Sequence, residues 1–519
     1  MSRIKRLAHS LASGYVLLGA NVIYTLTSFR LAGKYLGPAE FGLWAVVTNL
    51  AQYIALIDLG MTSTSRILID YKDHRDAGDY GSVIKTFLVV SLIQAILIVL
   101  LSIGLAVALV PVLHIPGTLK HQFIYLTIGQ CGVLGAGFLS RIFPFVLSAH
   151  QRYDLVNYTQ TAGFALGLGA MWAAFVHHQG IYSTLWAQFA SWLVNGALTC
   201  VWVLRMQLLP ARRCWGRATW SRFRELFALG SDLFLYALGF QMLSASQTVI
   251  LTRQLGLEAS ALWSVCTRTF SLVSQIIYRV FDYAGPALAE MIVRGERERL
   301  YQRFRSLVVL SASLSVCAGT IFAICNQPFV ALWMRRQYGW WPLNDGLLAF
   351  WLVLQATTRC HLGLVGVSKE IRSMRFIYLA EGTFFVVLGL LVLRWGGITA
   401  MLLCSIAGTM LFSAPYGFWR TSQYFNVPWK VPSFEWWLPP LRLALGLVPL
   451  AGLLWWLTRP LPLRPQLLIR GAASALLALP LLLRFGLDAE LRKEILARAP
   501  ARFQPLLRTI ASTRMKDEG

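Results

Sequence analysis

Acidic residues are scarce in this chain. Its 519 residues include 23 Asp and Glu against 47 Lys and Arg, and charged residues make up only 13% of the total. This low charge, together with 56% hydrophobic residues, is typical of a polytopic membrane protein. A net charge of +24 would indicate nucleic-acid binding in a soluble protein. Here the charge lies in short loops, where the positive-inside rule explains it, so no nucleic acid is expected as a partner.

Metal-binding and catalytic motifs are also missing. No pair among the eight cysteines has metal-ligand or redox spacing, and most of them lie inside apolar segments. The sequence has no phosphate loop and no nucleophile elbow. We therefore expect no metal site and no bound cofactor.

Long apolar runs fill the chain instead. A membrane-spanning helix needs about 20 mainly apolar residues. This length predicts an all-α polytopic membrane protein with about 14 transmembrane helices. The predicted spans are 11–31, 41–61, 83–112, 123–147, 155–176, 182–204, 227–251, 262–284, 307–329, 347–367, 376–393, 398–418, 437–457 and 467–487.

The basic residues predict the orientation. With the N-terminus inside, the inner loops and tails hold roughly thirty Lys and Arg and the outer loops about eight. Both termini are therefore predicted to be cytoplasmic. The outer loops are mostly shorter than about 12 residues, which is too short for a lid over a sugar, so an enzyme acting on a lipid-linked sugar is not expected.

An internal repeat divides the chain. The segment LGPAEFGLW at 36–44 recurs as LGLEASALW at 255–263, and each copy joins the first and second span of its half. A repeat in the same orientation relates two helical bundles about an axis along the membrane normal. The predicted parts are an N-lobe at 1–206, a basic cytoplasmic linker at 207–226, a C-lobe at 227–420, two extra helices at 421–487, and a basic amphipathic or disordered tail at 488–519.

Several predicted spans contain an ionisable residue well inside. Such a residue costs about 2.5 to 3.5 kcal/mol at the bilayer centre and is kept where it faces water, a partner or a substrate. Arginines outnumber acids in this set, which predicts a transporter with a partly cationic interior, suited to an anionic cargo. The set comprises Arg30, Arg141, Asp232, Arg268, Arg279, Asp282, Arg359, Glu381 and Arg442.

The segment FRLAGKYLGPAEFGLW at 29–44, continuing to IDLG at 57–60, resembles the opening of polysaccharide-biosynthesis flippases of the Wzx type. A further similarity lies at 262–270 (LWSVCTRTF) and 286–290 (PALAE). The resemblance implies two six-helix lobes in a V around a central cavity, in the bacterial inner membrane. It implies that an undecaprenyl-diphosphate-linked oligosaccharide crosses by alternating access, for O-antigen, capsule or exopolysaccharide. Implied partners are this glycan, membrane lipids, and the polysaccharide polymerase and export machinery.

A diphosphate cargo needs fixed cations, and arginine binds phosphate through a planar fork that cannot lose its charge. In the implied architecture, the spans of Arg30 and Arg268 both line the cavity, so these two are predicted to bind the diphosphate. The alternative for Arg30 is snorkelling to the outer interface, and for Arg268 a structural pair with Asp232. Arg141 and Arg359 are further diphosphate candidates. For Arg141, a kink at Pro144 would free a backbone carbonyl as a partner.

Three carboxylates are candidates for coupling or gating. Asp58 ends the second span and either latches the inner gate, by pairing with Arg66 or another basic residue, or is an ordinary helix-end acid. Asp232 and Glu381 are more buried candidates for coupling H⁺ or Na⁺ to transport, with structural pairing as the alternative. Asp282 lies near Arg279 on one helix, which predicts an intrahelical pair.

Two neighbouring functions stay open. A lipid II-type flippase would share the mechanism with another headgroup, and a multidrug or metabolite antiporter would share the fold. An antiporter of cations usually needs an acidic cavity, which the surplus of arginines argues against. Trp333, Trp340 and Trp341 flank the longest outer loop and are interpreted as an interfacial aromatic belt, with sugar stacking as the alternative.

Overall fold

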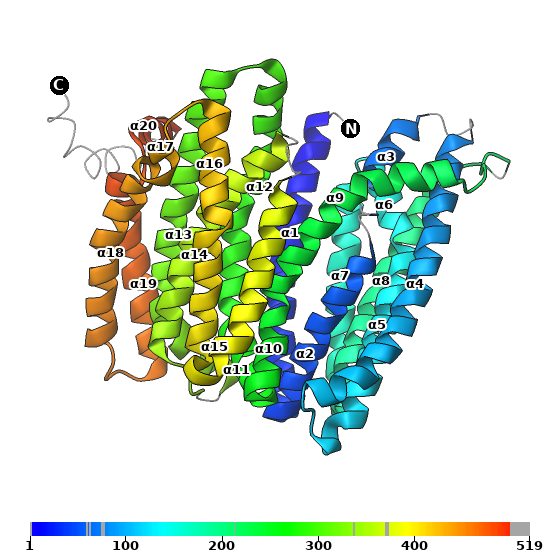
Figure 1. Ribbon diagram of the computed structural model, residues 1–519, viewed down its shortest axis with the longest axis horizontal. Coiled ribbons are helices and arrows are strands. Elements are labelled where there is room, and N and C mark those ends of the chain that lie inside the picture. The colour runs from blue at the N-terminus through cyan, green and yellow to red at the C-terminus, as the bar shows by residue number, and fades with distance from the viewer. Residues whose placement is uncertain are drawn as a thin grey trace. The chain divides into compact units, whose positions relative to one another are not determined.

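The structure, a computed structural model, describes residues 3–58, 61, 64–73, 78–211, 213–335, 338–368 and 373–498. All regular structure in these ranges is helical (Figure 1). The chain forms two compact units, Met1–Ser264 and Val265–Gly519. The first unit contains α1 (Arg3–Tyr35), α2 (Pro38–Ile54), η1 (Ala55–Asp58), α3 (Thr64–Tyr71), α4 (Asp79–Val112), η4 (Gly117–Leu119), α5 (Lys120–Ser140), α6 (Ile142–Ala149), α7 (Tyr153–Val176), η5 (Gly180–Tyr182), α8 (Ser183–Arg205), α9 (Trp220–Ser244), α10 (Ser246–Leu255) and most of α11 (Leu257–Cys266).

The second unit begins within the last residues of α11. Its helices are α12 (Arg268–Arg294), α13 (Arg297–Met334), α14 (Pro342–Val367), α15 (Met374–Leu411), α16 (Ser413–Phe425), α17 (Lys430–Ser433), η6 (Glu435–Trp437), α18 (Leu438–Leu457), α19 (Leu463–Leu481), η7 (Leu482–Gly486) and α20 (Ala489–Arg498). The boundary after Ser264 lies beyond the expected linker at 207–226, because α9 and α10 make contacts with α4 and α2 of the first unit.

All fourteen predicted spans are helical over nearly all of their described residues. Eleven stretches of the described residues are long and apolar enough to cross a membrane. The longest, Met374–Phe425, holds two predicted spans, because Gly397 has φ 55° and ψ −149° and breaks the helix between them. The remaining two predicted spans correspond to α7 and to α11–α12, of which α12 carries two arginines and an aspartate in its predicted span. The protein is therefore an all-α, multi-pass membrane protein.

Three predicted spans contain a local irregularity. Single residues separate two helices in the fourth, seventh and eighth predicted spans, at Arg141, Ala245 and Thr267. All three residues keep right-handed helical φ and ψ angles, and hydrogen bonds from a backbone N–H to the carbonyl four residues earlier continue through them. The helical path therefore continues past Arg141 and Arg268.

In the first unit, the two copies of the repeated segment lie against each other. Gly42 of the first copy packs so closely on the second that an added Cβ would lie 1.9 Å from the backbone oxygen of Leu257. Further along the same pair of helices, the Asn49 amide donates to Thr248 Oγ1 at 3.2 Å. Tyr53 and Ser246 also share a hydrogen bond between their hydroxyls. Glycine at position 42 is required by this close approach of α2 to the start of α11.

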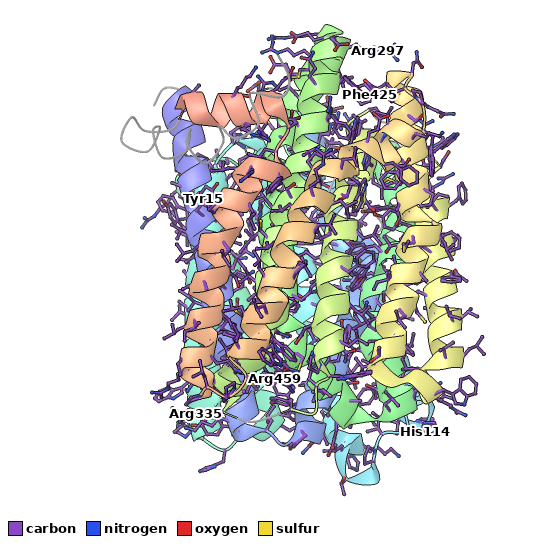
Figure 2. The ribbon with its side chains drawn as sticks, turned by 90° about the vertical axis from the view of Figure 1, so that its left-hand side faces the viewer. Tyr15, His114, Arg297, Arg335, Phe425 and Arg459 are labelled. Carbon is purple, nitrogen blue, oxygen red and sulfur yellow. The ribbon has the colours of Figure 1, made fainter. Side chains whose placement is uncertain are left out.

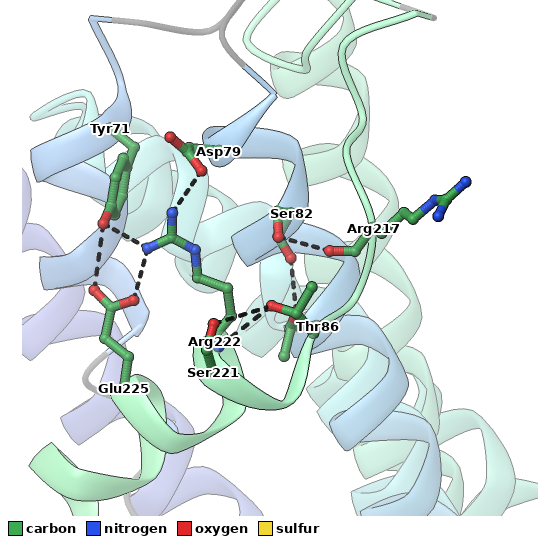
Figure 3. Close-up of polar contacts among 9 residues, drawn as sticks. Tyr71, Asp79, Ser82, Thr86, Arg217, Ser221, Arg222 and Glu225 are labelled. Atoms are coloured by element: carbon green, nitrogen blue, oxygen red, sulfur yellow. Dashed lines mark hydrogen bonds and ion pairs between the residues drawn. The ribbon is translucent and has the colours of Figure 1, made fainter.

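The basic linker is fastened to the first unit by Arg222 (Figure 3). Its guanidinium contacts Asp79 at 2.5 Å, Glu225 at 2.8 Å and the Tyr71 hydroxyl at 2.6 Å. The hydrogen bond to Glu225, together with those to Asp79 and Tyr71, raises the pKa of Arg222 above its ordinary value despite partial burial. Carboxylates from α4 and α9 therefore compensate the arginine charge, and with the Tyr71 hydroxyl of α3 they hold these elements together.

In the second unit, α13 is the central helix. It packs against α12, α14, α18 and α19, and 67% of its most apolar 18-residue window is buried inside the protein (Figure 1). Figure 2 shows Arg297, at its start, and Phe425 at one end of this unit, with Arg335 and Arg459 at the other. The extra helices α18 and α19 thus join the core of the second unit through α13.

The tail after the last span begins with α20. Asp488 caps this helix by accepting from the Leu491 backbone N–H at 2.9 Å, and Arg303 of α13 pairs with Glu494 at 2.5 Å. The amphipathic or disordered tail predicted for 488–519 is described only as far as Arg498, and its later part lies outside the described residues.

Candidate functional site

The first unit contains an ion pair between its second and fourth spans. Arg141 Nη2 lies 2.6 Å from Asp58 Oδ1, and the two side chains are 24% and 17% exposed. The guanidinium also stacks on the Phe138 ring, 3.8 Å from the ring centroid. Gln94 of α4 donates to the backbone carbonyls of Ile57 and Asp58 at 2.8 and 3.1 Å, which holds the 3₁₀ turn that presents the carboxylate.

This pair changes the expectations for both residues. The basic partner expected for Asp58 is Arg141 and not Arg66. The backbone-carbonyl partner expected for Arg141 is replaced by the Asp58 carboxylate. A carboxylate is the stronger acceptor for a partly buried guanidinium.

The second unit has a similar pair. Arg359 Nη2 on α14 lies 2.8 Å from Asp282 Oδ1 on α12, with the side chains 42% and 39% exposed. The guanidinium lies over the Tyr278 ring at 4.8 Å, and the Tyr278 hydroxyl donates to Gln355 at 2.9 Å. The intrahelical partner predicted for Asp282, Arg279, is therefore wrong: the carboxylate reaches across to a neighbouring helix instead.

The two pairs occupy corresponding places in the repeat. The repeated segments start at 36 and 255, an offset of 219 residues. This offset takes Arg141 to position 360, next to Arg359, and Asp58 to position 277, five residues before Asp282. In each half, an aspartate of the second span pairs with an arginine of the fourth span. All four residues are visible in the sequence as charges inside predicted spans, but only the structure shows which of them form pairs.

Arg30 lies in the first unit and Arg268 in the second. The side chain of Arg30 on α1 is exposed, and the described residues offer it no ion pair or hydrogen bond. Arg268 is half-buried and begins α12, directly after Thr267. The side chain of Asp232, its proposed structural partner, lies outside the described part of the structure.

Glu381 is the most buried of the candidate carboxylates that are described, at 2% exposed. Thr409 Oγ1 donates to its Oε1 at 3.1 Å from the other arm of the α15 hairpin, beyond Gly397. Ser413, at the start of α16, also lies close to this carboxylate and stabilises its charged form. A carboxylate held among hydroxyl groups at this depth is suited to hold a proton or a small cation.

Arg470 was not among the candidate site residues predicted from the sequence. It lies within the last predicted span and is only 2% exposed, and its charge inside an apolar run is the feature that could have identified it.

The interpretation of Trp340 as an interfacial residue is also wrong. It is 6% exposed and donates to Asp345 Oδ1 at 2.9 Å, and Asn326 donates to the same oxygen at 2.7 Å. Trp341, at 61% exposed, is consistent with an interfacial position.

The fold resembles that of known transporters. A lipid II flippase, MurJ, in an inward closed conformation has a TM-score of 0.66 and 11% identity over 90% of this chain and 97% of its own. An inward-facing multidrug resistance MATE transporter of the MOP superfamily has a TM-score of 0.60 and 15% identity over 78% and 95%. A MOP superfamily transporter from Pyrococcus furiosus has a TM-score of 0.57 and 14% identity over 82% and 97%. At these identities the likeness concerns the fold alone.

No curated protein is similar enough to the chain to match it. The sequence model of a family described as polysaccharide biosynthesis protein matches residues 33–340, which is more than half of the chain. This region contains the internal repeat, the Asp58–Arg141 pair and the motif around Arg268, but it begins three residues after Arg30. Because this match covers more than half of the chain, the protein belongs to the polysaccharide biosynthesis protein family, and it has the fold that transporters of the MOP superfamily share.

Proposed function

We propose that this protein is a flippase that moves an undecaprenyl-diphosphate-linked oligosaccharide across the cytoplasmic membrane for surface polysaccharide synthesis. The observation that carries the proposal is the family match over residues 33–340, on a chain whose fold is shared with a lipid II flippase. The intramembrane arginines support an anionic cargo, because fixed guanidinium groups suit a diphosphate.

Arg30 and Arg268 are the proposed diphosphate ligands. Arg30 is supported by its exposure on α1. Arg268 is supported by its half-buried position at the start of α12. The oxygens of a diphosphate accept bidentate arginine contacts, so either arginine is chemically suited to it.

Arg141 and Arg359 take part as paired cations. Each is neutralised by an aspartate while no cargo is bound, so the protein carries no bare charge at that position. A passing diphosphate competes with the aspartate for the guanidinium. This exchange is easier at Arg359, because that pair is about 40% exposed and the Arg141 pair is about half as exposed.

Alternating access requires contacts that open and close. The α2–α10 contact through Asn49 and Thr248, with the close packing of Gly42 on Leu257, is the proposed closed gate on the side opposite to the N-terminus. Glu381 and Asp232 are each proposed as a carboxylate at which a proton or Na⁺ couples to opening. A membrane potential supplies about 2.3 kcal/mol per charge per 100 mV to such a step.

The test replaces Arg30 and Arg268 singly with Ala and with Lys in the native cell, and Arg394, an exposed arginine of α15, with Ala as a control. Surface polysaccharide and lipid-linked precursor are measured together with the amount of inserted protein. We expect R30A and R268A to lose most polymer and to accumulate precursor on the inner leaflet, with R394A unaffected. A milder effect of Lys would identify charge, and not the bidentate fork, as the requirement.

Two results would reject the proposal or part of it. If both Ala variants keep normal polymer at normal protein levels, the two arginines are structural. If deletion of the whole gene leaves polysaccharide intact, the cargo is different: rising drug sensitivity would identify an antiporter, and accumulation of lipid II with cell lysis would identify a lipid II-type flippase.

A further inference from the structure

The second unit contains a cavity of about 320 Å³ between α13, the start of α14 and the α18–α19 hairpin. Two arginines, Arg459 and Arg470, line it, together with the aromatic side chains of Tyr338, Trp340 and Trp455. Arg459 lies at the end of the unit opposite to Arg297 (Figure 2). The cavity lies where the C-terminal helices α18 and α19 meet α13 and α14, and it shares no residue with the proposed diphosphate site.

Arg470 is a buried cation without a carboxylate. Its guanidinium donates to Thr458 Oγ1 at 2.8 Å, to the Ile324 carbonyl at 2.9 Å and to the Trp455 carbonyl at 3.1 Å. All three acceptors are neutral, and within the described residues no carboxylate lies within ion-pair distance of it. A guanidinium has five N–H donors, so two remain for a ligand.

Arg459 adds a second positive charge to the same cavity. It lies over the Trp455 ring at 4.8 Å and, in the described part of the chain, has no ion pair either. One acid stands nearby: Asp345 is fully buried and accepts from Asn326 and Trp340, both of which line the cavity. With Asp345 ionised, the two arginines still leave a net positive charge.

An uncompensated buried charge is costly, and the cost falls when a ligand supplies the opposite charge. The donors favour a phosphate, because arginine forks match its oxygens. The depth favours a lipid as its source. Arg470 lies seven residues into α19, about 10 Å along the helix, and a long arginine side chain at this depth reaches toward the headgroups at the near end of the span.

We propose that this cavity binds the phosphate of an anionic phospholipid, with Arg470 and Arg459 as its ligands and Trp455 and Trp340 against the glycerol and upper acyl chain. The site fixes the α18–α19 hairpin to α13 in the membrane. It is independent of the transported cargo, so its test neither needs nor decides the proposed function.

The experiment uses the purified full-length protein, stripped of lipid in detergent. Native mass spectrometry measures retention of phosphatidylglycerol and, in a separate titration, of zwitterionic phosphatidylcholine. Arg459→Gln is the informative variant, because its side chain is exposed and supports no ion pair. Arg464→Gln is the matched control. Arg464 is also exposed and lies in the first turn of α19, but it does not line the cavity. The thermal unfolding midpoint without lipid reports whether each variant is folded.

We expect the wild type to retain phosphatidylglycerol about tenfold more tightly than phosphatidylcholine. R459Q should weaken phosphatidylglycerol retention about tenfold with an unchanged midpoint, and R464Q should leave it unchanged. Arg470→Lys, which keeps the charge but has fewer donors, should give an intermediate loss. Equal effects of R459Q and R464Q, or no preference for phosphatidylglycerol, would overturn the proposal. If millimolar inorganic phosphate displaces the lipid and stabilises the wild type but not R459Q, the cavity takes a soluble phosphate and the lipid assignment is wrong.

Discussion

The two repeat halves use the same pair of residue types at corresponding positions, but in different surroundings. The Asp58–Arg141 side chains are 17% and 24% exposed, with an aromatic ring and a glutamine-held turn around them. The Asp282–Arg359 side chains are 39% and 42% exposed. A partly buried pair fastens two helices, whereas an exposed pair is screened by water and can exchange its partner. We infer that the Asp58–Arg141 pair mainly stabilises the first half, and that the Asp282–Arg359 pair mainly serves transport.

The largest expected effect comes from removing one partner of the more buried pair. Asp58→Ala leaves the Arg141 guanidinium without its carboxylate in a site that is largely dry, which should lower the free energy of unfolding by about 3 kcal/mol. Chemical denaturation of the purified protein in mixed micelles measures this loss. Arg141→Met in the D58A background removes the stranded charge and should recover part of it; a double variant as unstable as D58A would show that Arg141 is not the cause.

The next effect separates use from stability. Arg359→Gln removes the exchangeable guanidinium of the exposed pair and should reduce transport about tenfold, equivalent to about 1.4 kcal/mol, with little loss of stability. Arg141→Gln, the corresponding change in the first half, should lower the free energy of unfolding more than it lowers transport. Reconstituted flipping of a lipid-linked substrate, measured beside the unfolding curve, resolves the two effects. If both variants lose transport and stability in the same proportion, the comparison between the halves fails.

These contrasts also show how far the sequence reaches. The fourteen spans follow from apolar length, and the second-span aspartates and fourth-span arginines are visible as charges inside them. Their pairing is not visible, because Asp58 and Arg141 are separated by 83 positions and meet only through helix packing. Arg279 is nearer to Asp282 in sequence, yet Arg359 from another helix takes the carboxylate. The role of Trp340 was hidden for another reason: its acceptor Asp345 is close in sequence, but the burial of both residues against Asn326 of α13 follows only from helix packing.

A smaller effect is expected for Asp282→Ala, the counterpart of D58A. Because both side chains of this pair are more than a third exposed, the free energy of unfolding should fall by only about 0.5 kcal/mol. The loss should shrink further in 1 M salt, where the screening length is about 3 Å, whereas the D58A loss should persist. Unfolding curves of both variants at low and high salt test this. A D282A loss as large as that of D58A, and equally insensitive to salt, would make the second pair structural too.

The smallest effect is expected for the Arg152–Asp154 ion pair at the start of α7, which serves as a reference for the other two ion pairs. Burial disfavours the charged form of Asp154, but hydrogen bonding and charge attraction from Arg152 outweigh it and hold the pKa of this carboxyl below its usual value. A lowered folded-state pKa contributes stability above the unfolded pKa of about 3.9, and this contribution disappears as the pH falls through the folded value. Asp154→Asn should therefore cost a few tenths of a kcal/mol at pH 7 and nothing at pH 2. Unfolding midpoints of the variant and the wild type that converge on acidification would confirm this sign. A constant difference at every pH would assign the effect to packing at the start of α7, and the exposure of a pair would then not predict its contribution.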